Sequence, residues 1–165
     1  MKKFSRIIIC LLAALTLFSA LISCGGEKTY KNDVAVSALA ESGVKKISLA
    51  SNLTEASGEF MSFYLNVDSS LYSECKVMSP GGSSSIDEFG IFKAKDADSA
   101  EKIAEALNKY LEGRVATWDN RYSQSEKPKV DGAKTDIYGN YVCYTILSSS
   151  EQSAFLNAIE DMITE

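Results

Sequence analysis

The clearest pattern along the chain is a helical repeat of apolar positions between residues 96 and 122. Large apolar residues recur there at steps of three and four: Ile103, Leu107, Leu111, Val115, Trp118 and Tyr122. This period predicts a long helix with one continuous apolar face, and Asp98 with Glu101 forms a capping-box pattern near its start. Ser149 and Gln152 repeat that pattern at the start of a second predicted helix, which runs to about residue 164.

Alternating apolar and polar residues predict two β-hairpins, one ahead of each helix. The first pairs residues 71–78 with 87–94 across a loop rich in Gly and Ser. The second pairs residues 133–138 with 141–148 across Gly139-Asn140, a two-residue hairpin signal. Two successive strand–strand–helix units predict an α+β fold, with a four-stranded antiparallel sheet and both helices on one face.

Two shorter helices are predicted at the start of the domain, over residues 33–42 and 54–65. Both faces of the strand 141–148 are apolar, because two apolar sets alternate along it: Tyr141, Cys143 and Leu147, and Val142, Tyr144 and Ile146. The second face of the sheet therefore needs a cover. Two alternatives stay open: the N-terminal helices cover this face, or it is an exposed binding surface.

The first 23 residues have the organisation of a bacterial export signal. Three basic residues (Lys2, Lys3 and Arg6) precede an almost wholly apolar run over residues 7–17. The following Leu21-Ile22-Ser23-Cys24 resembles a bacterial lipobox. That resemblance implies attachment of diacylglycerol to the Cys24 sulfur and cleavage before it, and two acyl chains make such anchoring effectively irreversible.

This interpretation divides the chain into a signal peptide (1–23), a lipidated tether (24–32) and a single α+β domain (33–165). It places the domain on the outer, extracytoplasmic face of the cell membrane, held there by the lipid on Cys24. The alternatives are an ordinary cleaved signal or an uncleaved helix. A membrane-spanning helix needs about 20 apolar residues, whereas here Gly25-Gly26 follows the apolar run.

Composition narrows the choice of function. The chain of 165 residues has a formal net charge of −5, and removing the three basic residues of the signal leaves 14 basic against 22 acidic residues, or −8. An acidic exported domain is a poor match for nucleic acid. The chain contains 0 His, which excludes Ser-His-Asp and Cys-His nucleophile systems and every zinc site that uses histidine.

Two cysteines remain in the predicted mature domain, Cys75 and Cys143. They could form a disulfide, because an exported protein reaches an oxidising compartment. Alternatively they are two small buried residues in strands, since cysteine is among the most buried residue types.

No catalytic set, cofactor site or metal site is predicted. Nothing selects a catalytic pair from the acidic residues, although paired carboxylates could serve a hydrolase. Five aromatic residues could form a stacking patch for a sugar or peptide, or belong to the core: Trp118, Tyr122, Tyr138, Tyr141 and Tyr144. We therefore expect a membrane-tethered, non-catalytic domain that binds a protein, peptide or envelope ligand. The alternatives are an accessory subunit of a membrane complex and, third, a carboxylate-based hydrolase.

Several features occur in the order typical of a known family. They are Leu65-Asn66-Val67-Asp68, an acidic-aromatic strand over residues 87–96 that ends in Lys-Ala-Lys-Asp, Trp118 near a helix end, and Gly139-Asn140-Tyr141-Val142. With the lipobox, this order resembles short lipoproteins of low-GC Gram-positive bacteria that are classed as a domain of unknown function. The resemblance covers roughly residues 63–163, and its motifs are structural, so it implies kinship and transfers no active site. The two cysteines and the Gly/Ser loop depart from the family pattern.

Overall fold

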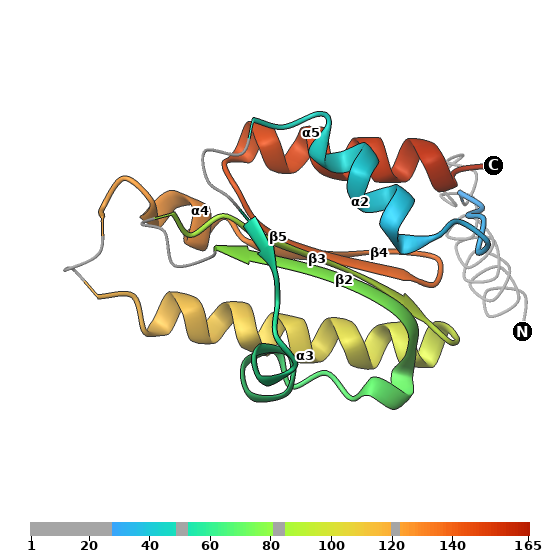
Figure 1. Ribbon diagram of the computed structural model, residues 1–165, viewed down its shortest axis with the longest axis horizontal. Helices are drawn as coiled ribbons and strands as arrows, with labels where there is room; N and C mark the ends of the chain where they lie inside the picture. The colour runs from blue at the N-terminus through green and yellow to red at the C-terminus, as the bar shows by residue number, and fades with distance from the viewer. Residues whose placement is uncertain (1–27, 49–52, 81–84, 120–122) are drawn as a thin grey trace, which may run out of the picture.

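The computed structural model describes residues 28–48, 53–80, 85–119 and 123–165. The strands are β1 (Leu53–Glu55), β2 (Tyr72–Pro80), β3 (Glu88–Ala94), β4 (Lys134–Tyr138) and β5 (Tyr141–Ile146). The helices are α2 (Val36–Val44), α3 (Ala97–Ala116), α4 (Lys127–Asp131) and α5 (Ser149–Ile163), with a π-helix η1 (Phe60–Leu65) and a 3-10 helix η2 (Ser69–Leu71). The strands form one antiparallel sheet in the order β1-β2-β3-β5-β4, which confirms the α+β class (Figure 1).

Both predicted hairpins are present, β2–β3 and β4–β5, and β3 pairs with β5 at the centre of the sheet. Gly139 in the second turn has a φ of 57°, a conformation that costs glycine little. The sheet has a fifth strand that was not predicted, because Leu53–Glu55 pairs with the end of β2. The helix predicted over 54–65 is therefore a short strand followed by the π-helix η1.

Helices cover both faces of the sheet, so the prediction that both long helices share one face is wrong (Figure 1). The helix α3 packs with strand residues that include Phe92 and Val142, whereas α2 and α5 pack with Phe89 and Ile91 on the opposite face. Every residue of β5 is buried, so both faces need a cover. At 9 residues α2 is too short to cover one face alone, and α5 lies beside it.

The first predicted helix, over residues 33–42, begins three residues later, at Val36. The caps of the two long helices lie one or two residues ahead of the predicted ones. The Asp96 side chain, not Asp98, caps α3 by accepting a hydrogen bond of 2.7 Å from the backbone N–H of Ser99. Ser148, not Ser149, caps α5. The α3 helix ends at Ala116, so its predicted last turns lie beyond it. A further short helix that was not predicted, α4, follows it.

The segment before α2 is docked on the domain. Backbone hydrogen bonds join Lys31 N–H to the Ile163 carbonyl (2.7 Å) and Glu165 N–H to the Thr29 carbonyl (3.1 Å), and Lys28 Nζ lies 2.6 Å from Glu160. Residues 28–31, assigned above to the tether, therefore run alongside the end of α5. Within the described ranges, no helix combines the length and the apolar character that crossing a membrane requires.

Candidate functional site

A pocket of about 280 Å³ lies between η1 and the C-terminal end of α3. Seven residues line it: Phe60, Tyr64, Ile86, Tyr110, Arg114, Thr117 and Trp118. We call it the aromatic pocket, because four of these side chains are aromatic. Arg114 is the one charged residue among them, so the pocket joins stacking surfaces to a single cation.

The outer wall of the aromatic pocket is η1. Asn66 closes this π-helix by donating its N–H to the Met61 carbonyl, five residues back, with a left-handed φ of 50°. The Phe60 ring turns inward against Tyr110, with ring centroids 6.1 Å apart. Phe63 and Tyr64 face solvent, with 81% and 66% of their surface exposed. Neighbouring exposed aromatic side chains of this size are a mark of binding surfaces.

Behind the pocket lies a buried carboxylate, Glu88, at the first position of β3. Only 1% of its surface is exposed. The Tyr144 hydroxyl donates to Oε1 at 2.6 Å, and the Tyr110 hydroxyl lies 3.0 Å from both carboxylate oxygens. Arg114 Nη1 donates to Tyr110 at 2.6 Å and to Glu88 Oε2 at 3.2 Å. We call Glu88, Tyr110, Arg114 and Tyr144 the buried tetrad.

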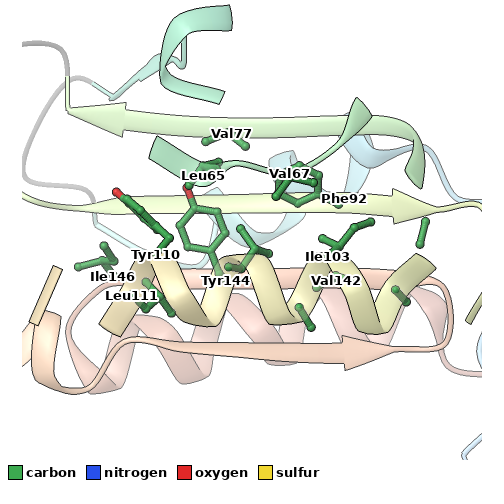
Figure 2. Close-up of a cluster of buried hydrophobic side chains, with 14 of the residues drawn as sticks. Leu65, Val67, Val77, Phe92, Ile103, Tyr110, Leu111, Val142, Tyr144 and Ile146 are labelled. Carbon is green, nitrogen blue, oxygen red and sulfur yellow. The ribbon is translucent and has the colours of Figure 1, made fainter. Parts of the chain in front are cut away.

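The tetrad draws its members from three elements, and Figure 2 shows Tyr110 from α3 beside Tyr144 from β5 in the apolar cluster. Their rings meet edge to face, 6.0 Å apart. Burial raises the pKa of the Glu88 carboxyl, while the hydrogen bond from Tyr144 and the charge of Arg114 oppose that shift. Burial also raises the pKa of Tyr110 and of Tyr144, so both phenols stay protonated donors. The tetrad therefore fixes the guanidinium of Arg114 at the pocket.

The neighbouring carboxylate, Asp87, has separate partners. It is 2% exposed and accepts hydrogen bonds from Lys129 Nζ (2.6 Å) and the Ser85 hydroxyl (2.9 Å). Lys129 also contacts Glu126 at 2.9 Å. These contacts hold α4 against the start of β3, next to the position of Glu88, and neither Asp87 nor Glu88 lines the aromatic pocket.

The structure separates four of the five aromatic residues that were considered as a stacking patch. Trp118 lines the aromatic pocket. Tyr141 and Tyr144 are fully buried and belong to the clusters on opposite faces of the sheet. Tyr138 packs edge to face on Tyr30, with ring centroids 5.8 Å apart. The fifth, Tyr122, lies outside the described residues.

Of the two alternatives left open for Cys75 and Cys143, a disulfide or two separate buried residues, the structure has both cysteines free. Cys75 packs against the cluster beneath α3, and Cys143 lies in the cluster beneath α2 and α5. The two sulfurs therefore lie on opposite faces of the sheet. Burial raises the pKa of both thiols. The predicted lipidation site, Cys24, lies outside the described residues.

Sequence reasoning missed most of the site. The signals it could have used are Glu88 at the head of an apolar strand, and Tyr110 with Arg114 one helical turn apart. The approach of η1 to the end of α3 is a contact between distant segments, and no local pattern indicates it.

Comparison with known proteins gives one match. The model of a family described as Domain of unknown function (DUF4358) matches residues 45–147. No curated protein and no solved structure matches the chain. The match spans more than half of the chain and includes β1 to β5, with both members of the Glu88–Tyr144 contact. Within the described part of the chain, no group of three or more His, Cys, Asp or Glu residues is placed to hold a metal ion.

Proposed function

The chain belongs to the DUF4358 family, and from that premise we propose that it is a membrane-anchored extracytoplasmic lipoprotein whose domain binds a protein or peptide at the aromatic pocket. The observation that carries the proposal is the exposed Tyr64 in the wall of a pocket that also holds a fixed arginine, with the exposed Phe63 next to it on η1. Aromatic residues and arginine are the side chains most enriched at the energetic centres of protein interfaces.

The place of the pocket in the fold supports this function. Lys28 is docked at the end of α5, and Gly139 in the β4–β5 turn lies close to Tyr30. The aromatic pocket lies at the other end of the sheet, where β3 begins and α3 ends. In Figure 1 this end, marked by α4, is opposite the end that carries the C-terminus.

The segment between Cys24 and the docked Lys28 is short. Three residues, Gly25 to Glu27, separate Cys24 from Lys28. Four steps of 3.8 Å between consecutive Cα atoms span at most about 15 Å. A lipid on Cys24 would therefore hold the Lys28 end of the domain close to the bilayer, and the aromatic pocket would face away from the membrane, toward extracytoplasmic partners.

Two variants test the two parts of the proposal. The first, Cys24→Ser, removes the acylated sulfur and should move the protein from the membrane fraction to the soluble fraction. The second, Phe63→Ser, changes an exposed side chain and should leave the free energy of unfolding within about 0.5 kcal/mol of wild type. The same change should reduce partners co-purified from crosslinked cells at least fivefold. An unchanged set of partners would contradict binding at η1.

A further inference from the structure

We infer that the aromatic pocket takes the carboxyl-terminal residue of a peptide, with the terminal carboxylate on Arg114 and an apolar side chain among the rings of Phe60, Tyr64 and Trp118. This inference rests on the proposed function, because it names the ligand class of the same pocket. Its basis is the charge and the hydrogen-bonding state of Arg114.

Arg114 is the one charged residue among the seven that line the pocket, and no carboxylate is among them. A cation in an aromatic pocket favours an anionic group on the ligand. Glu88 lies behind Arg114, 3.2 Å from Nη1, and offsets part of its charge. Glu88 does not line the pocket, so among the lining residues the guanidinium is the charged group that a ligand would contact. A carboxylate fits the planar fork of a guanidinium better than other common peptide groups.

The hydrogen bonds of Arg114 leave donors for such a ligand. A guanidinium carries five N–H groups. In the described part of the chain, its bonds to Tyr110 and Glu88 both come from Nη1. The Nε and Nη2 groups share the opposite edge of the fork, which suits two-point contact with a carboxylate. The bonds from Nη1 hold the side chain against the buried tetrad, so binding would not have to order a free arginine.

The remaining walls suit an apolar side chain. Phe60 packs on both Tyr64 and Tyr110, with ring centroids 5.4 and 6.1 Å apart, so this wall is already formed. The pocket of about 280 Å³ has room for one side chain. The Thr117 hydroxyl donates to the Gly113 carbonyl at 2.8 Å, which leaves its oxygen to accept a bond from a peptide N–H.

The single tryptophan of the chain gives a direct readout, because Trp118 lines this pocket. Acetylated tripeptides ending in Phe, Leu or Val are titrated into the purified mature protein in detergent, each as the free acid and as the C-terminal amide. We expect at least one free acid to change the Trp118 fluorescence and to bind at least tenfold tighter than its amide. Phenylacetate, a free aromatic acid, should bind at least tenfold more weakly than that peptide.

Matched variants assign the preference to Arg114. In Arg114→Gln the acid and the amide should bind within twofold of each other, whereas Tyr64→Ser should weaken both forms equally and keep their ratio. If Arg114→Gln does not fold, the ratio of the affinities of acid and amide for the wild-type protein alone tests the inference. Equal binding of acid and amide would overturn the inference and leave pocket binding intact. No binding by any peptide, or phenylacetate binding as tightly as the peptide, would also overturn it, while crosslinking tests the proposed function separately.

Discussion

The ring of Tyr144 lies directly over Gly90, its partner on the neighbouring strand β3. A Cβ atom at position 90 would come within 2.3 Å of Tyr144 Cε1. The ring cannot move aside freely, because its hydroxyl is bonded to Glu88 at 2.6 Å. This glycine therefore makes the space in which the buried tetrad is assembled.

Replacing this glycine should destabilise the protein. We expect Gly90→Ala to lower the free energy of unfolding by about 1–3 kcal/mol, the usual cost of overpacking a core. Gly113→Ala is the matched control, because a Cβ there meets no atom within 4 Å. Gly113 lies in the last turn of α3, so that change should raise stability by at most about 0.5–1 kcal/mol, the gain in a helix interior. Urea unfolding measures the free energy of unfolding of both variants. Equal changes in the two variants would contradict the close packing of Tyr144 on Gly90.

The tetrad should also give stability a defined pH dependence. Because the pKa of Glu88 is raised on folding, its contribution is greatest below the ordinary carboxyl pKa and is lost as the pH rises through the folded-state value. The lowered pKa values of Glu74 and Asp96 act in the opposite direction. They cancel when wild type is compared with Glu88→Gln.

The measurement is urea unfolding of wild type and Glu88→Gln from pH 4 to pH 8. The stability of wild type relative to the variant should fall as the pH rises. A relative stability that increases with pH would mean that the hydrogen bonds and Arg114 outweigh burial, with the carboxyl pKa lowered instead.

The start of α5 gives a test of helix capping. Ser148 accepts a hydrogen bond from the backbone N–H of Glu151 and donates to the Glu151 carboxylate. Ser148→Ala should therefore cost about 1 kcal/mol of unfolding free energy. Ser149→Ala, one residue further on at an exposed position, should cost less than about 0.5 kcal/mol. A larger loss for Ser149→Ala than for Ser148→Ala would support Ser149, the cap predicted from the sequence.

Thiol labelling tests the separation of the two cysteines. Cys143 is fully buried, whereas Cys75 is partly exposed. Without reductant, the folded protein should label at Cys75 alone, and the urea-unfolded protein should label at both. Mass spectrometry counts the labels. An unfolded protein that labels at neither position would show that the two cysteines are paired.

The parts of the fold that could be predicted from the sequence are those set by neighbours along the chain. Gly139-Asn140 indicates a hairpin because a two-residue turn needs a special φ, and the spacing from Ile103 to Leu111 indicates a helix because the period is local. The side of the sheet that each helix covers depends on the burial of both faces of β5 and on the shortness of α2. Neither strand–strand–helix unit contains that information by itself.

The candidate site also combines features that the local sequence shows with features that depend on distant segments. The aromatic residues of 60–64 are visible in the sequence as a helical pattern, but the pattern does not indicate that Phe63 and Tyr64 are exposed. Their exposure follows from the π-helix, which the left-handed Asn66 closes. Trp118 was a candidate on residue type alone. Its contact with the pocket depends on α3 ending at Ala116.

The aromatic pocket, in the proposal made above, is the face at which this domain binds its partner. The most direct test is a photo-crosslinking amino acid placed at position 63 in living cells, with the same residue at the exposed Ser153 on α5 as the control. We expect a discrete crosslinked product from position 63 that is absent from position 153 and lost when Tyr64 is also changed to Ser. The same products from both positions, or none from position 63, would contradict the proposal.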